Sequence, residues 1–180
     1  MIDWTAVEIG DRHVAALSLF LRDGPQAWEQ LHKQEMTTNQ GAAAYMQMFH
    51  AAFTVAVRRK FAPTYTIHEI VRYVAKLRIE LKNLGDDDFN PRIAENSIRG
   101  ALGDPTLKNW DKAKIVEDAK EVEQLINAQS VVLFDVLLSE EEESGAGVVE
   151  EYVRESVDLA QRWVLERQTA QIEERTSTGN

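Results

Sequence analysis

The sequence predicts an all-α protein, a compact bundle of about six or seven helices with a C-terminal helix that follows an acidic linker. Three observations support this fold class. Apolar side chains recur at spacings of three and four residues along most of the chain, as they do in amphipathic helices. Strand-like alternation of apolar and polar residues is missing from the sequence. Glycine, proline and aspartate separate the periodic segments, at places where helices are expected to end.

The N-terminal part of the chain predicts two short helices followed by a long one. Residues 11–22 form an amphipathic segment that ends at Asp23 and Gly24, and Pro25 suits the first turn of the next helix. The third predicted helix, residues 38–60, carries alanine, methionine, phenylalanine and valine around most of its circumference. Such a distribution is expected of a central, largely buried helix.

Residues 66–84 form the most completely specified element. Thr66 and Glu69 have the spacing of a capping box, and Gly85 suits the left-handed residue that terminates a helix. Six large aliphatic residues follow one another at spacings of three and four. These residues are Ile67, Ile70, Val74, Leu77, Leu81 and Leu84. We expect this helix to be the element against which the others pack.

The C-terminal half predicts three further helices and sets the domain boundaries. Asn90 and Pro91 suit the start of a short helix that ends before Gly103. A long helix is expected over residues 111–138, and the last one over about 148–174, with a disordered tail from Thr176. The predicted organisation is a helical domain (1–138), an acidic, small-residue linker (139–147) and a C-terminal amphipathic helix (148–175).

The composition excludes several classes of protein. The chain of 180 residues has 44% apolar and 28% charged residues, which is typical of one ordinary globular domain. Cysteine is absent, so disulfides, thiolate metal sites and cysteine nucleophiles are excluded. Met1–Trp4 lacks the basic and apolar regions of a secretory signal, and the apolar run 42–57 is too short and too polar to cross a bilayer. We expect a cytoplasmic protein that does not associate with membranes.

The charge is distributed unevenly. Residues 1–103 carry 12 basic and 12 acidic side chains, whereas residues 104–180 carry 8 and 18, which accounts for the net charge of −10. An acidic C-terminal part would repel phosphates, so nucleic-acid binding is not expected. It is compatible with a basic partner, and also with acidity that only maintains solubility.

Residues 58–82 form a locally basic region in this acidic protein, with seven bases against Glu69 and Glu80. Three interpretations compete: a docking surface for the acidic C-terminal part of the same chain, a site for an anionic partner, or solvated helix faces. The residues that we select as candidates for a partner or an anion are Arg59, Lys60, Arg72 and Lys76.

A narrow polar stripe on the predicted helix 38–60 is the second candidate site. Gln47, His50, Thr54 and Arg58 lie at helical offsets of three, seven and eleven. If this stripe faces a cleft, its amide, imidazole, hydroxyl and guanidinium groups could bind a small anionic ligand. If it faces solvent, it is the exposed edge of the helix.

Metal binding has two weaker candidates. Glu29 and His32 have the Glu-x-x-His spacing of di-iron carboxylate bundles, but a second such pair is missing. Asp86, Asp88 and Asn90 match the first ligand positions of a calcium loop, although the glycine and the last glutamate of that loop are missing. We expect no metal and no other cofactor.

The leading hypothesis for function is a non-enzymatic helical interaction module, such as an adaptor, regulator or inhibitor. Recognisable catalytic motifs are missing from the sequence. Tyr152 and Trp163 lie on the apolar face of the last helix, which can fold back on its own domain or pack across a dimer axis, so self-association is expected. The alternatives are a regulator or small enzyme that binds an anion on the 47–58 stripe, and a metal-binding helical bundle.

Overall fold

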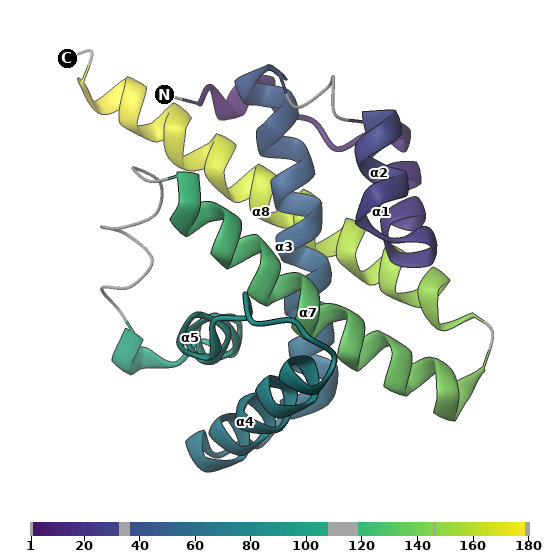
Figure 1. Ribbon diagram of the computed structural model, residues 1–180. Coiled ribbons are helices and arrows are strands. Elements are labelled where there is room, and N and C mark those ends of the chain that lie inside the picture. The colour runs from purple at the N-terminus through teal and green to yellow at the C-terminus, as the bar shows by residue number, and fades with distance from the viewer. Residues whose placement is uncertain (1, 33–36, 108–118, 146, 179–180) are drawn as a thin grey trace. The chain divides into compact units, whose positions relative to one another are not determined.

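The computed structural model describes residues 2–32, 37–107, 119–145 and 147–178, and these residues confirm the all-α fold class. They form seven α-helices and two short 3₁₀ helices, and contain no strand (Figure 1). In chain order the elements are η1 (Trp4–Ala6), α1 (Asp11–Asp23), α2 (Pro25–His32), α3 (Asn39–Phe61), α4 (Ile67–Asn83), α5 (Pro91–Ala101), η3 (Pro105–Leu107), α7 (Ala119–Ser144) and α8 (Val148–Thr178).

Two helices in the C-terminal part extend beyond their predicted ends. Residues 139–144 are not a linker, because α7 continues through them to Ser144. Gly145, with φ of 79°, follows as the residue at which the chain leaves the helix. The tail is helical as far as Thr178, where the Thr176 hydroxyl donates hydrogen bonds to the carbonyls of Ile172 (3.1 Å) and Glu173 (2.8 Å). Residues 111–118 of the predicted long helix lie outside the described residues.

The chain divides into two compact units. The first comprises residues 1–52 and 143–180, and the second comprises residues 53–142. The division differs from the predicted one, which separated residues 1–138 from the last helix. Both boundaries of the second unit fall inside long helices, α3 and α7.

In the first unit, α8 packs against α1 and η1, and α1 packs against α2. The buried face of α1 includes Leu17 and Phe20, and the Phe20 ring meets Phe49 edge to face at 5.7 Å. An ion pair between Arg22 and Glu150 joins α1 to the start of α8. The last predicted helix therefore packs on residues of its own chain.

Side chains of α8 hold the N-terminal segment by its backbone. The Gln168 amide donates to the carbonyls of Trp4 (3.2 Å) and Val7 (3.0 Å). Gln171 accepts a hydrogen bond from the Trp4 N–H at 2.8 Å. Val7 is buried in a small apolar cluster with Val164 of α8. The segment is thereby fixed although it has little regular structure of its own.

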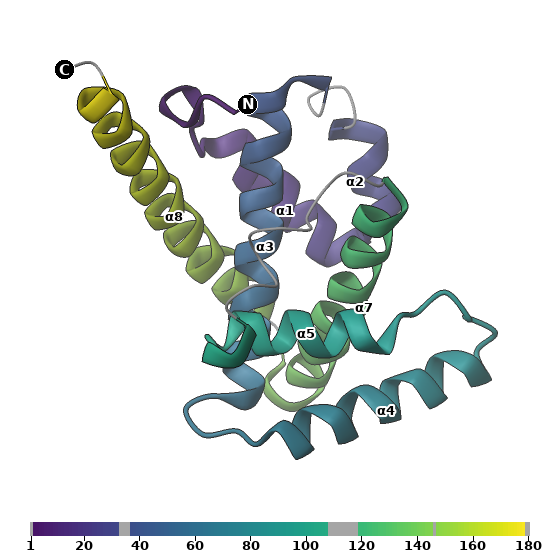
Figure 2. The same cartoon turned by 90° about the vertical axis from the view of Figure 1, so that its left-hand side faces the viewer.

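In the second unit, α4 and α5 lie side by side and are joined by residues 84–90 (Figure 2). The capping box at the start of α4 is confirmed: the Glu69 N–H donates to the Thr66 hydroxyl at 3.2 Å, and the Thr66 N–H donates to the Glu69 carboxylate at 2.7 Å. Hydrogen bonds from the Thr66 N–H and hydroxyl lower the pKa of Glu69. Gly85 adopts φ of 85° after the helix, as predicted.

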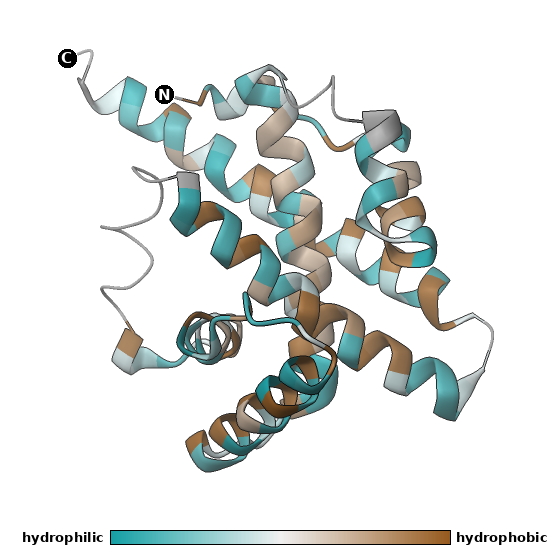
Figure 3. Cartoon of the chain, in the orientation of Figure 1, coloured by the Kyte–Doolittle hydropathy of each residue, from teal (hydrophilic) through white to brown (hydrophobic). Residues whose placement is uncertain are grey.

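The apolar stripe of α4 is buried in its middle and exposed at its ends. Ile70, Val74 and Leu77 are buried, whereas Ile67 is 47% and Leu84 83% exposed. The helix is therefore anchored by its central turns. Figure 3 shows hydrophobic and hydrophilic residues alternating along the visible side of α4.

Tyr73 connects α4 to two further elements of the second unit. Its hydroxyl donates a hydrogen bond of 2.7 Å to Asp135 of α7. Its ring packs edge to face against Phe61 of α3, with the centroids 5.4 Å apart, and the Lys60 ammonium lies 4.6 Å from the ring centroid. An ion pair of 2.9 Å between Arg59 and Glu140 also joins α3 to α7. These contacts fix the rotation of α4 about its own axis.

The segment 120–144 of α7 has the length and the apolar composition of a helix that could cross a membrane. A core helix passes the same test, and α7 has buried residues at its centre, among them Val132, Leu133, Val136 and Leu137. Four glutamates, residues 140–143, follow near its end. The property alone does not assign α7 to a membrane.

Truncation of the buried α4 residues should destabilise the chain much more than truncation of an exposed one. Leu77→Ala removes a buried side chain and should lower the free energy of unfolding by about 2–5 kcal/mol, measured by urea denaturation. Leu84→Ala, at the exposed end of the same stripe, should change it by less than about 0.5 kcal/mol. Equal losses for the two variants would mean that α4 buries a different face.

Candidate partner-binding groove

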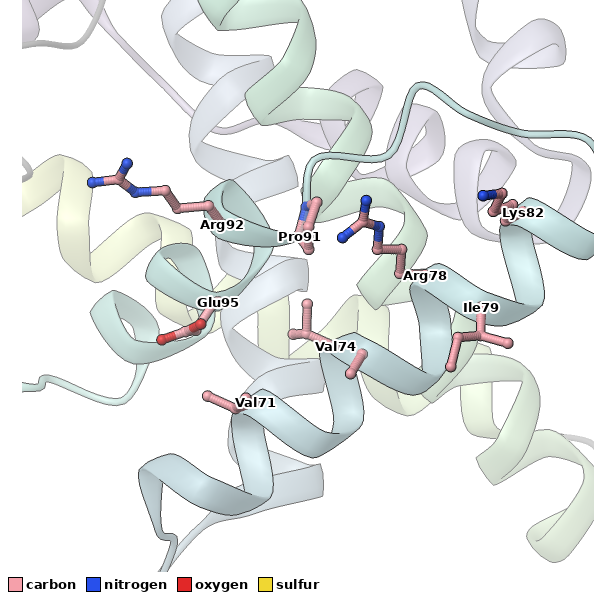
Figure 4. A pocket seen from close by; sticks show the side chains of 9 residues that line it. Val71, Val74, Arg78, Ile79, Lys82, Pro91, Arg92 and Glu95 are labelled. Carbon is pink, nitrogen blue, oxygen red and sulfur yellow. The ribbon is translucent and has the colours of Figure 1, made fainter.

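A groove between α4 and α5 is the strongest candidate site in the described part of the chain. Its volume is about 540 Å³, and both helices belong to the second unit. Figure 4 shows the side chains that line it. They are Val71, Val74, Ala75, Arg78, Ile79 and Lys82 from α4, and Pro91, Arg92 and Glu95 from α5.

The apolar part of the groove comes from the row of α4 residues next to its buried stripe. Val71 and Ala75 are one turn apart and lie beside the buried Ile70 and Val74. Val71 is 43% and Ile79 62% exposed, so large apolar side chains remain in contact with solvent. Exposed apolar side chains that cluster along one helix, rather than occurring singly, are typical of an interaction surface.

The first turn of α5 forms the opposite wall. The Asn90 side chain accepts hydrogen bonds from the N–H groups of Arg92 and Ile93, both at 3.2 Å, and Pro91 occupies the first turn. This cap defines where α5 begins. Pro91 and Val74 point toward one another across the groove, and Arg78 projects beside Pro91 (Figure 4).

The charge along the groove is predominantly positive. Arg78 and Lys82 extend the Val71 row by two and three turns, and Arg92 projects from α5. Among the residues that line the groove, Glu95 is the one acid. Its carboxylate lies 3.5 Å from the Arg99 guanidinium, which reduces the extent to which it can neutralise the other three cations.

A second acid holds Arg99 in the last turn of α5. The Arg99 guanidinium donates to Asp104 at 2.8 Å, and the Asp104 carboxylate also accepts hydrogen bonds from the Thr106 hydroxyl (2.7 Å) and N–H (2.9 Å). The Thr106 hydroxyl, the Thr106 N–H and Arg99, in that order, lower the pKa of Asp104 to about 2. The network ties η3 to α5, which is the helix that forms one wall of the groove.

This arrangement suits an elongated partner that is both apolar and acidic. A groove that follows two turns or more of a helix can take an amphipathic helix, whose apolar residues recur every three or four positions. The Arg78, Lys82 and Arg92 side chains would face its carboxylates. Arginine forms two parallel hydrogen bonds with a carboxylate, so two of these three cations add geometric selectivity to the attraction.

The basic residues selected from the sequence are not those that line the groove. Each of the four has another neighbour: Arg59 pairs with Glu140, Lys60 lies over Tyr73, Arg72 donates to His68 at 2.7 Å, and Lys76 lies 3.5 Å from Glu80. Arg78 and Lys82 belong to the same basic region but were not among the predicted site residues. Their offsets of seven and eleven residues from Val71 place all three on one side of a helix, and this spacing could have identified them.

The 47–58 stripe does not present its four side chains to one environment. In the first unit, Gln47 accepts a hydrogen bond from Arg167, and the His50 ring lies 6.4 Å from the Trp163 ring. In the second unit, Thr54 is buried, and Arg58 is exposed. The observations therefore favour neither a shared anion site nor a wholly exposed helix edge.

The two residues predicted to form an oligomer interface pack against residues of their own chain. Tyr152 is fully buried, and Trp163 is half-buried beside His50 of α3. The apolar face of α8 that carries them is the face that packs within the first unit. Their packing against their own chain leaves the opposite side of α8 toward solvent.

The metal candidates have other structural roles or fall partly outside the described residues. Glu29 is exposed on α2, and the side chain of His32 lies outside the described residues. Asp86 accepts the Asp88 N–H at 2.9 Å, which makes it a turn-forming residue, and Asn90 caps α5. Within the described ranges, no cluster of three or more histidine, aspartate or glutamate side chains could hold a metal ion.

Comparison with known proteins adds no family to this description. No protein-family model matches the chain, and no curated protein or solved structure is significantly similar to it.

The Asp104 network should titrate at an unusually low pH. Because the pKa of Asp104 in the folded chain is about 2, below the ordinary 3.8, its contribution to stability is complete above about pH 4 and is lost as the pH falls toward 2. An NMR titration of the Asp104 carboxyl carbon should give a midpoint near 2. Thr106→Val, which removes the hydroxyl donor, should move this midpoint toward 3.8. A midpoint already at 3.8 in the unmodified chain would contradict the network.

Proposed function

We propose that the protein is a helical interaction module whose α4–α5 groove binds an acidic amphipathic helix of a partner protein. The observation that carries this proposal is the row Val71, Ala75, Arg78 and Lys82, in which exposed apolar and basic side chains follow one another along a single side of α4. The same row faces Pro91 and Arg92 of α5.

Charge complementarity selects the kind of partner. A basic helix would meet three cations of the same sign, which would oppose association. A nucleic acid would use the cations but would leave the Val71 and Ile79 side chains without an apolar contact. An acidic amphipathic helix satisfies both parts of the surface, since it carries carboxylates and aliphatic side chains on one face.

The way in which α4 and α5 are held supports a groove that exists before the partner arrives. Tyr73 fixes α4 through Asp135, and Asn90 caps α5. A groove that is formed in advance loses less conformational entropy on binding than one that must be ordered. Binding energy is then available for the apolar and ionic contacts themselves.

A designed pair of peptides tests the charge requirement. Two helical peptides would carry the same leucine row, one flanked by glutamates and the other by lysines, and their affinities would be measured by fluorescence anisotropy. The glutamate peptide should bind at least about tenfold more tightly, because the lysine peptide places like charges against the groove. The double variant Arg78→Glu with Lys82→Glu should abolish this preference.

The apolar requirement has its own variant and control. Val71→Thr keeps the shape of an exposed side chain but reduces its apolar contact, and it should weaken binding of the glutamate peptide severalfold. Lys76→Glu, elsewhere on α4, should leave the affinity unchanged. Equal binding of both peptides would contradict the proposal. Full affinity of the Val71→Thr variant would also contradict it, because a site that does not depend on apolar contacts would be a general polyanion site.

A further inference from the structure

The outer side of α8 has the chemistry that the groove requires. Leu165 is 62% and Ile172 53% exposed, and the two residues lie seven positions apart on the same side of the helix. Glu166 and Glu173, each one residue further on, are also exposed and flank this pair. The opposite side of α8 carries Tyr152 and Ser156, which are buried.

The spacing of this surface agrees with that of the groove. Leu165 and Ile172 lie about 10.5 Å apart along the axis of α8, and the two large exposed apolar residues of the groove, Val71 and Ile79, lie about 12 Å apart along the axis of α4. On α8 the acidic positions form a row directly beside the aliphatic one, and on α4 the basic positions follow the aliphatic ones along the groove. A helix with this pattern can place its two aliphatic side chains against Val71 and Ile79 while its carboxylates approach Arg78 and Lys82.

We infer that the acidic helix that occupies the α4–α5 groove is α8 of a second copy of this chain. The inference rests on the proposed function, because it assigns the partner of the same groove. Two exposed surfaces of one sequence combine apolar side chains with charges of opposite sign, which favours contact between copies and opposes contact between like surfaces.

The contact joins two different surfaces, which has a consequence for assembly. If each copy gives its α8 to the groove of the other, two identical contacts close a two-fold dimer. If the contacts are not reciprocal, they continue from copy to copy and produce larger assemblies. In both cases the association depends on protein concentration and weakens as salt screens the ion pairs.

Sedimentation velocity on the full chain tests the inference. From about 1 μM to about 1 mM, the range of weak to moderate affinities, the average mass should rise above that of one chain of 20.4 kDa. Added salt should lower it again. A chain that remains monomeric throughout this range overturns the inference.

Complementary charge reversals distinguish contact between copies from contact within one chain. One variant carries Arg78→Glu with Lys82→Glu, and the other carries Glu166→Lys with Glu173→Lys. Each alone should associate at least about tenfold more weakly, because its groove and its α8 then have like charge. When the two are mixed, each groove meets an α8 of opposite charge, and association should return.

The outcomes separate the inference from the proposed function. Recovery in the mixture supports contact between copies, since a misfolded variant could not regain association by mixing. A mixture in which the two variants do not associate overturns the inference. If the glutamate peptide binds the groove while the unmodified chain stays monomeric, the inference fails and the proposed function stands.

Discussion

Burial of Ile70, Val74 and Leu77 on one side of α4 determines what the rest of that helix can do. Each of these side chains contributes roughly 1.5–3 kcal/mol when it is removed from water, more than any surface charge on the helix can contribute. The stripe therefore sets the rotation of α4, and the rotation determines that Val71, Ala75, Arg78 and Lys82 face outward. The basic and apolar groove is a consequence of this packing rather than of local helix propensity.

The remaining contacts of the second unit preserve that geometry. Tyr73 links α4 to α7, the Asn90 cap positions α5, and the network of Arg99, Asp104 and Thr106 ties the end of α5 to η3. Each is a short-range polar interaction. Together they hold α4 and α5 beside one another, so that exposed side chains of the two helices form the opposite walls of the groove. A partner helix would add a third layer to this pair, which follows the general rule that helices bury one face against another.

Local signals in the sequence predicted the fold well, and tertiary neighbours account for what they missed. The Thr66–Glu69 box, Gly85 and the Asn90–Pro91 pair each act within one helical turn, so their positions could be read directly. The glutamates at 140–143 looked like a linker, but glutamate is a good helix former and Glu140 pairs with Arg59, which is 81 residues away. For the same reason the sequence predicted a basic region over residues 58–82 but did not identify Arg78 and Lys82 as the residues that line the groove. Which cations face a groove depends on partners distant in the sequence.

The most direct test of the central claim is to map the surface of the ¹⁵N-labelled chain that responds to an acidic amphipathic peptide by NMR. We expect the amide signals of Val71, Ala75, Arg78 and Lys82 to shift progressively with peptide concentration, together with those of the first turn of α5. Signals of α1 should not respond. Shifts confined to α1, or spread evenly over the chain, would contradict the assignment of the α4–α5 groove as the binding surface.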